Sequence, residues 1–332
     1  MINFRYHVVS IIGIFIALAV GVVLGAGPLQ SRIQAGVSSS ATTSAADPLL
    51  SAQADAEAAG LKALASSTLT GSLSSAKVAL VVLPGASDDD VTAIRSTLTD
   101  AGASVVGRVT LTDNWQSTSM SQYRTTLSTT LASHLPSGAA KTASADGVVG
   151  YSIVQVLTTT GAETDLLRQI LSDESTPIMT VDEDANGSAT AIVAVGPRAQ
   201  ATVATNATPA GVTTSPDAWV GLGQALGSTN GVLVGDASTR EAMISQVRAS
   251  GTVVTTVDSV GTTLAAADTA LALSTPTTTA RAFGVGTGAQ SVIPPVKELA
   301  TFFAEAPVVR SDLRGLVAFL LVQGAGLYSM AY

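Results

Sequence analysis

The feature that most constrains this chain is an uncharged apolar segment close to its start. From Val8 to Gly27 no residue carries a charge, and Ser10 is the only polar side chain. Twenty helical residues rise about 30 Å, the thickness of the hydrocarbon core of a bilayer. Residues 8–27 are therefore predicted to form a transmembrane helix. Arg5 precedes this helix and the first acidic residue, Asp47, follows far behind it, so the positive-inside rule places residues 1–7 in the cytoplasm.

A cleaved signal peptide is the alternative interpretation of the same segment. Val23-Leu24-Gly25 offers the small residues that a signal peptidase requires, whereas cleavage after Gly27 would place Pro28 at the disfavoured +1 position. An uncleaved anchor is favoured. The chain is then predicted to be a single-pass protein of the inner (plasma) membrane, with everything after about residue 28 outside the cytoplasm.

Small residues recur every four positions within the predicted anchor, at Gly13, Ala17, Gly21 and Gly25. They share one helix face, where a second helix can approach closely and gain contacts that lipid does not offer. The pattern predicts a homodimer or a partner helix. The alternative is that small residues are simply common in membrane helices.

Composition excludes several classes of function. Sixteen basic residues against twenty-four acidic ones give a net charge of −8, which argues against a nucleic-acid partner. The chain has no cysteine and only two histidines, His7 and His134, so disulfides, thiolate metal sites and cysteine nucleophiles are excluded. We therefore expect no catalytic residues, no cofactor and no metal site.

A linker and a stalk helix are predicted for residues 28–75. The Ser-, Ala- and Thr-rich residues 28–46 indicate a linker, and Asp47-Pro48 is a typical helix start. Apolar spacing then follows a coiled-coil register for about two heptads, with one acidic residue among the core positions. The positions are Leu50, Ala54, Glu57, Leu61 and Leu64. A stalk helix that pairs weakly is expected.

Two βαβ units are predicted beyond the stalk. In the first, the apolar run Lys77–Leu83 is a strand, a helix passes through Ile94, and Ala103–Leu111 is the next strand. The second runs from Val232–Gly235, through a helix containing Met243 and Val247, to Thr252–Val257. The fold class is therefore α/β with a parallel or mixed sheet, in an extracytoplasmic domain spanning 76–332. That domain forms one body or two lobes, 76–200 and 215–332.

Two further segments have a predicted structure. Ile178–Val181 and Ala189–Val195 flank an acidic stretch ending in Asn186-Gly187, which is typical of a β-hairpin. The apolar stretch 315–330 contains Gln323 and is short for a membrane span, so a buried or partner-facing terminal helix is favoured over a second pass.

Several motifs suggest chemistry but lack the required context. Asp182, Asp184, Asn186 and Gly187 match half of an EF-hand loop, but the twelfth position is Val193, so a turn is favoured over calcium binding. Gly221, Gly223 and Gly227 lack the spacing and the preceding strand of a dinucleotide loop. Gly284, Gly286 and Gly288 indicate a loop. A catalytic triad would need His134, at a predicted helix end, and no G-x-S-x-G elbow accompanies it.

The opening of the chain resembles a known family. The residues that carry the resemblance are Met-Ile-Asn-Phe-Arg-Tyr-His-Val-Val-Ser-Ile-Ile (Met1–Ile12), Ala17-Leu18-Ala19, Gly25, Val81–Ala86 and Gly102–Val109. They are similar to the start of the actinobacterial copper transporter MctB/SteB family over about the first 110 residues, and in layout beyond. The stalk departs from the family pattern, because relatives have a charged coiled coil where this chain is rich in Ser and Thr.

The resemblance implies two functions. One is copper export and copper resistance in the cell envelope. The other is an envelope adaptor that works with a SteA-like partner to control a peptidoglycan hydrolase during daughter-cell separation. Copper(I) favours thiolate and thioether ligands, but cysteine is absent and the five methionines are scattered.

The non-enzymatic adaptor is therefore favoured, with copper transport as the alternative. Its partners would be the SteA-like protein, the envelope peptidoglycan hydrolase or a regulator of it, and a second copy of the chain. The candidate partner-binding residues are Asn3, Phe4, Arg5, Tyr6 and His7. The alternative is that these residues merely sit at the lipid interface, where Tyr and Arg are common.

Overall fold

The computed structural model describes residues 48–136, 138, 140, 143–199, 213–276, 279–286 and 288–289. The predicted membrane helix at 8–27 and its small-residue face, the partner-binding residues before it, the linker up to residue 47 and the stretch 315–330 all lie outside the described residues. Within the described part, none of the helices is both long enough and apolar enough for a membrane crossing. The chain divides into two units at residues 55 and 56, and the features below belong to the second unit, apart from the first turns of the first helix.

Seven strands of the described chain form one sheet in the order β3-β2-β1-β4-β5-β6-β7. They are β1 (Lys77–Val82), β2 (Ser104–Leu111), β3 (Met179–Glu183), β4 (Ala191–Val195), β5 (Asn230–Val234), β6 (Thr255–Val257) and β7 (Arg281–Phe283). All neighbours are parallel except β2 and β3, which are antiparallel. The predicted α/β class with a parallel or mixed sheet is confirmed.

The most apolar strands occupy the middle of the sheet. From Val78 to Val82, β1 is buried, and all five residues of β4 are buried as well. A strand covered on both faces needs apolar side chains on both, which is why these two lack polar alternation. In β1, Ala79 and Val81 enter one core while Val78, Leu80 and Val82 enter the other. The sheet therefore separates two hydrophobic cores.

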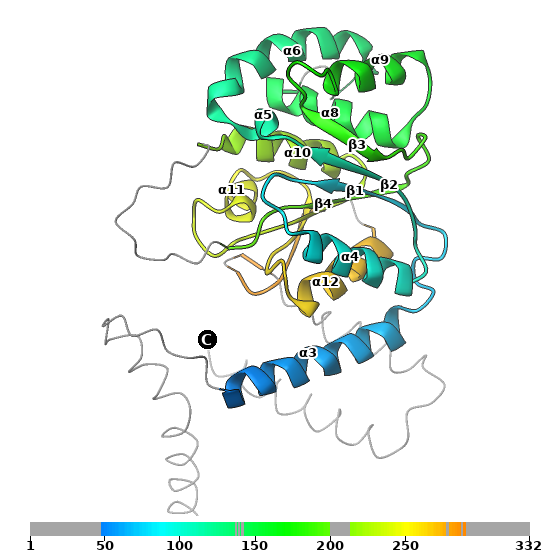
Figure 1. Cartoon of the computed structure of the whole chain (residues 1–332), viewed down its shortest axis with the longest axis vertical. Helices are drawn as coiled ribbons and strands as arrows, with labels where there is room; N and C mark the ends of the chain where they lie inside the picture. The colour runs from blue at the N-terminus through cyan, green and yellow to red at the C-terminus, as the bar shows by residue number, and fades with distance from the viewer. Residues whose placement is uncertain are drawn as a thin grey trace, which may run out of the picture. The chain divides into compact units, whose positions relative to one another are not determined.

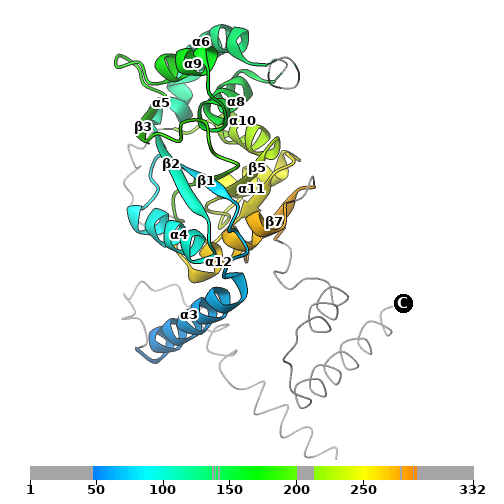
Figure 2. The ribbon, with the colours of Figure 1, turned by 90° about the vertical axis from the view of Figure 1, so that its right-hand side faces the viewer.

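Helices cover both faces of the sheet (Figure 1). One face carries α5 (Asp113–Gln116), α6 (Ser121–His134), α8 (Ala145–Thr158), α9 (Ala162–Leu171), α10 (Pro216–Gly227) and α11 (Met243–Ala249), with a single 3₁₀ turn, η1 (Thr118–Met120), between α5 and α6. The opposite face carries α4 (Asp88–Asp100) and α12 (Thr263–Ser274), which pack against each other. The view in Figure 2 shows β7 at the far edge of the sheet from β3.

Both predicted βαβ units are confirmed. β1, α4 and β2 form the first, and β5, α11 and β6 form the second, with parallel strand pairing in each. Gly102 and Gly251 follow the two helices with φ of +95° and +71°, a conformation that costs glycine little. The two units therefore end their helices in the same way.

The predicted hairpin between residues 178 and 195 is wrong. Asn186 and Gly187 do form a turn with positive φ at both residues, but the strands on either side do not pair with each other. β3 pairs with β2, and β4 lies between β1 and β5. The polar sequence of β3 suits an edge, whereas β4 is apolar throughout and is stable only in the middle of the sheet.

The predicted stalk helix is α3 (Pro48–Leu69). Near its end, Ala65 and Leu69 pack against the core beneath α4 and α12. Two leucines of the coiled-coil register face solvent, Leu50 at 57% and Leu64 at 65% exposure. Pairing of α3 with another helix stays a prediction.

Candidate functional site

The direction of the chain through the sheet reverses between β1 and β4. From β1 the chain passes through α4 to β2 on one side, and from β4 it passes through α10 to β5 on the other. In doubly wound sheets, ligands bind in the crevice outside the carboxyl ends of the strands at such a point. The carboxyl ends of β1 and β4 are therefore the candidate functional site.

A cleft of about 520 Å³ opens at this point and is called the switch-point cleft below. Pro84 and Ser87 line it from the loop after β1, and Pro197 and Arg198 line it from the loop after β4. Trp219 of α10 and Met243 of α11 add an aromatic and a thioether surface. Its volume and mixed lining are typical of a small-molecule or peptide site.

Three polar groups in the cleft wall have no partner in the part of the chain that the structure describes. Among the described residues, neither the hydroxyl of Ser87, the carboxylate of Asp113 nor the amide nitrogen of Gln116 has a hydrogen-bond or ion-pair partner. Gln116 is only 9% exposed, and its Oε1 accepts a hydrogen bond of 3.3 Å from Trp219 Nε1. The side-chain amide is thereby held in place while its N–H groups remain available. Of the three, only Gln116 is buried, and a ligand would satisfy its amide N–H groups, since buried polar groups are normally paired.

The charges around the cleft argue against a phosphate ligand. Helix α4 begins beside the cleft with three aspartates in its first turn, so carboxylates already occupy the positive end of its dipole. Asp90 is buried and pairs with Arg198 through bonds of 2.7 and 2.6 Å, and this partner raises the pKa of the Arg198 guanidinium. Asp88 pairs with Arg108. A nucleotide site at this point is not supported.

His134 lies away from this cleft, at the end of α6. Its Nδ1 is 2.5 Å from Oε2 of Glu163, in the first turn of α9. The pair borders a separate hollow of about 590 Å³ that is lined in part by threonines. Within the described residues no hydroxyl hydrogen-bonds to the imidazole, so a nucleophile–base pair is not assembled around His134. The histidine at the end of α6 is therefore paired with the carboxylate of Glu163, a partner that the sequence does not predict.

The loop that contains Gly284 and Gly286 binds a carboxylate of the same chain. The N–H groups of Val285 and Gly286 donate to the buried carboxylate of Asp258, at 2.7 and 3.0 Å. Arg248 and Ser259 donate to the same carboxylate at 2.9 and 2.7 Å. Burial alone would raise the pKa of Asp258, but these four hydrogen bonds outweigh burial and lower it. The glycine-rich loop therefore holds a carboxylate of its own chain.

The glycines at 221, 223 and 227 lie within α10 and serve helix packing. A Cβ at Gly221 would come within 2.4 Å of the backbone of Asp146, on α8. Across the same crossing, a Cβ at Gly150 would lie 2.7 Å from the carbonyl oxygen of Gly221. Gly227 likewise faces the backbone of Val253. These glycines allow close approach of backbones rather than of a dinucleotide.

Two aspartates of the half EF-hand pattern form ion pairs with arginines. Asp182 is 3.3 Å from Arg108 Nε, and Asp184 is 3.4 Å from Arg168 Nη2. Asp184 also accepts the backbone N–H of Asn186, which closes the turn. The expectation of turn chemistry at these residues agrees with this arrangement.

Asp268 is a buried carboxyl group on α12. It is 1% exposed, and its Oδ2 has no hydrogen-bond partner. Burial, followed by the nearby charge of Asp258, raises the pKa of Asp268 to about 7. A carboxyl group in this position is held largely neutral below neutral pH.

Soft copper ligands do not gather in the described residues. Met179 and Met243 are both buried, and Met243 packs its methyl group against Gly196 and Gly235. No cluster of three or more histidine, cysteine, aspartate or glutamate residues is placed to hold a metal ion in the described part of the chain. One thioether in the switch-point cleft is too few for a copper(I) site.

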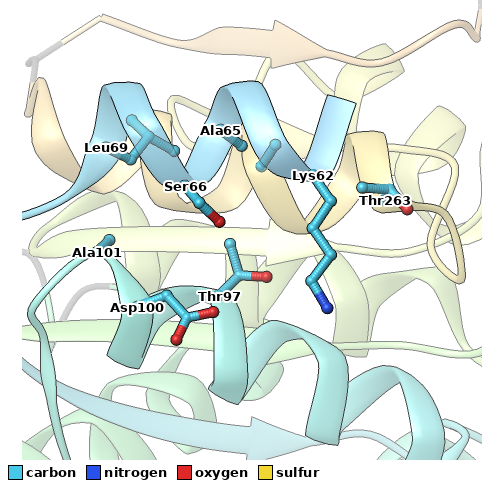
Figure 3. A pocket seen from close by; sticks show the side chains of 9 residues that line it. Lys62, Ala65, Ser66, Leu69, Thr97, Asp100, Ala101 and Thr263 are labelled. Carbon is cyan, nitrogen blue, oxygen red and sulfur yellow. The ribbon is translucent and has the colours of Figure 1, made fainter. Parts of the chain in front are cut away.

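A small hollow lies where α3 crosses α4 and α12. Figure 3 shows Lys62, Ser66 and Leu69 of α3 facing Thr97 and Asp100 of α4. The hollow has a volume of about 20 Å³, close to the space of one water molecule. It is a packing gap rather than a ligand site.

The residues of the switch-point cleft escaped sequence reasoning because they are spread over the chain. Ser87, Asp113, Gln116, Arg198 and Trp219 are brought together only by the strand order. The available signal was the position of Ser87 just after a buried strand that ends in Pro-Gly. The strand that precedes Arg198 gives no matching signal, because the Asn186-Gly187 turn before it predicts a hairpin rather than a central strand.

Residues 1–294 match the model of a family described as "Copper transport outer membrane protein, MctB". Comparison with curated proteins gives no significant match.

Proposed function

The chain belongs to the MctB copper transport family, and from that premise we propose that it acts in copper handling of the cell envelope as a tethered, non-catalytic binding protein. The family match, which spans most of the chain, is the observation that carries this proposal. Copper is the cargo of the pathway. The chain contributes by binding a partner or ligand through its α/β domain.

The donor set favours an indirect role in copper handling. Copper(I) is held by cysteine and methionine, and copper(II) by imidazole. The described domain offers three methionines, two of them buried, and one histidine that is paired with Glu163. These residues do not form a coordination shell, so this domain is proposed to assist transport without holding the ion itself.

Membership makes the chain a membrane-associated envelope protein. The finer topology is part of the proposal: residues 8–27 form one span of the plasma membrane, the N-terminus is cytoplasmic, and residues 76–332 are extracytoplasmic. The uncharged segment and Arg5 support this arrangement. Gly13, Ala17, Gly21 and Gly25 are proposed to pack two copies together, so Gly21→Leu should remove a crosslinked dimer that Ile14→Leu retains.

The test is growth of a deletion strain across a copper series. Full-length protein should restore tolerance, whereas the domain released from the membrane by a cleavable signal sequence should not. A deletion strain with normal copper tolerance would overturn the proposed role. Restoration by the released domain would overturn the requirement for the tether but leave the copper role in place.

A second candidate function is favoured by the exposed face of α3. Leu50 and Leu64 are largely exposed at predicted heptad positions, which suits contact with another protein. The second candidate is the adaptor that works with a SteA-like partner to control a peptidoglycan hydrolase in daughter-cell separation. Residues Asn3 to His7 are proposed to meet that partner.

The adaptor makes a separate prediction. Deletion should cause chains of unseparated cells, and Phe4→Ala with Tyr6→Ala should reproduce the chaining while leaving membrane insertion intact. Arg5→Lys, which keeps the charge, is the matched control and should separate normally. Normal separation in the deletion strain would exclude this function.

A further inference from the structure

The switch-point cleft offers a positive and a negative group on opposite sides of β1. Asp113 follows β2, and Arg198 follows β4, so strand β1 lies between the two. Neighbouring strands are about 4.8 Å apart, which places these two positions roughly 10 Å apart across the mouth of the cleft. The site therefore suits an elongated ligand with opposite charges at its two ends.

The charged groups at both ends have capacity to bind. Asp113 is exposed and has no partner in the described chain. Arg198 uses Nε and Nη2 for Asp90 and is 52% exposed, so the remaining N–H groups of its guanidinium are open to a second carboxylate. The pairing with Asp90 also fixes the position of the guanidinium.

The wall between the two ends is partly apolar and partly hydrogen-bonding. Trp219 and Met243 provide surface for an apolar side chain, and the free amide N–H groups of Gln116 and the hydroxyl of Ser87 can bond to carbonyl oxygens. Gln116 is nine-tenths buried and held by Trp219, so it is preorganised as a donor. These are the features of a peptide backbone with one apolar side chain.

We propose that the switch-point cleft binds a short zwitterionic peptide, with its amine at Asp113 and its carboxylate at Arg198. An extended chain rises about 3.3 Å per residue, so roughly three residues span the 10 Å between the charged ends. The central side chain of such a tripeptide contacts Trp219 and Met243, and its carbonyl groups accept from Gln116 and Ser87. The proposal is independent of the role in copper handling.

The test uses full-length protein in detergent and the tripeptide Ala-Leu-Ala, with affinity measured by calorimetry. Free Ala-Leu-Ala should bind, and N-acetylation or C-terminal amidation should each weaken binding about tenfold or more, because each removes one charged hydrogen bond. Absence of binding by the free tripeptide would overturn the proposal. Equal affinity of the free and the acetylated peptide would overturn it as well.

A variant assigns the amine end. Asp113→Asn should remove the preference for free over N-acetylated peptide but keep the preference for free over amidated peptide. Asp217→Asn changes an exposed acid in the first turn of α10 outside the cleft lining and should alter neither preference. An unchanged preference for the free amine in Asp113→Asn would contradict the assignment.

The carboxylate end is tested through the ligand rather than by removing Arg198. Loss of that arginine would leave buried Asp90 unpaired and destabilise the domain. Amidated Ala-Leu-Ala removes the same contact without changing the protein. Equal binding of the amidated and free peptides would show that Arg198 does not hold the carboxylate.

Discussion

Two regions at the carboxyl edge of the same sheet use similar groups in opposite ways. Beyond β6 and β7, the glycine-rich loop and Arg248 give their hydrogen bonds to Asp258, a carboxylate of the same chain. Beyond β1 and β4, the hydroxyl of Ser87, the carboxylate of Asp113 and the amide N–H groups of Gln116 have no partner among the described residues. The hydrogen bonds of the first region, called the closed region below, are satisfied by folding, whereas we propose that a ligand satisfies those of the second, called the open region. The glycine-rich loop is therefore a feature of the closed region, and polar groups without partners in the described chain are a feature of the open region.

The largest expected difference between the two regions follows removal of a carboxylate from each. Asp258→Ala removes the carboxylate that pairs with buried Arg248 and accepts the N–H groups of Val285 and Gly286, and it should lower the free energy of unfolding by about 3–5 kcal/mol. Asp113→Ala should change it by no more than about 0.5 kcal/mol, because Asp113 is exposed and unpaired. Urea denaturation measures both, and equal losses would contradict the comparison.

Adding a methyl group to each loop gives the next largest difference. At Gly284, φ is +119° and a Cβ would lie 2.1 Å from Oδ1 of Asp258, so Gly284→Ala should cost roughly 2–4 kcal/mol of stability. Gly85 of the open region also has a positive φ, +80°, but its Cβ would meet only Pro197 at 3.5 Å. Gly85→Ala should therefore cost about 1 kcal/mol. A larger loss at Gly85, measured by the same denaturation, would reverse the distinction.

The closed region should also make stability depend on pH through Asp268. The pKa of this carboxyl is raised from 3.8 to about 7 by burial and then by the charge of Asp258. The protonated carboxyl of Asp268 makes its full contribution to folding stability below pH 3.8, and this contribution is lost as the pH rises to about 7. The reason is that the folded state releases the proton less readily than the unfolded state. Asp268→Asn should therefore raise stability at pH 8 by roughly 1–3 kcal/mol and change it little at pH 4.

Thermal unfolding at several pH values checks this prediction. Asp173→Asn is a useful contrast, because the pKa of that exposed carboxyl is lowered by hydrogen bonds from Ser175 rather than raised by burial. The same stabilisation of Asp268→Asn at pH 4 and pH 8 would show that ionisation of Asp268 is not its source.

The smallest effect on stability is expected inside the open region. Gln116→Leu removes the hydrogen bond to Trp219 Nε1 but leaves an apolar side chain of similar size, so the loss should stay within about 1 kcal/mol. Its effect should instead fall on peptide affinity, which calorimetry with Ala-Leu-Ala measures. Unchanged affinity in a folded Gln116→Leu variant would remove Gln116 from the site.

Much of the fold follows from local patterns in the sequence. The apolar runs of β1 and β5, the helices that follow them and the terminating glycines Gly102 and Gly251 predict both βαβ units. The pairing of β3 and β4 does not follow from local patterns, because it depends on which sheet edges and faces the rest of the fold leaves uncovered. The sequence predicts the Asn186-Gly187 turn correctly, but this turn connects an edge strand to a central one.

The candidate site was hidden for a related reason. The glycine clusters resemble ligand-binding loops, yet Gly221 allows α10 and α8 to cross closely, and Gly284 leaves room for the carboxylate of Asp258. Gln116 and Trp219 belong to short or apolar helices with no recognisable motif, and they become significant only when the strand order brings them beside Ser87. Sequence patterns predict well which residues of a helix or strand are buried, but they predict poorly which polar groups lack a partner in the folded chain.

We propose that this member of a copper transport family acts by binding through its α/β domain rather than by holding copper itself. Equilibrium dialysis of the full-length protein against copper(I), followed by metal analysis, tests it most directly. We predict a copper content well below one ion per chain at the end of dialysis. Retention of one or more tightly held copper ions per chain would contradict the account.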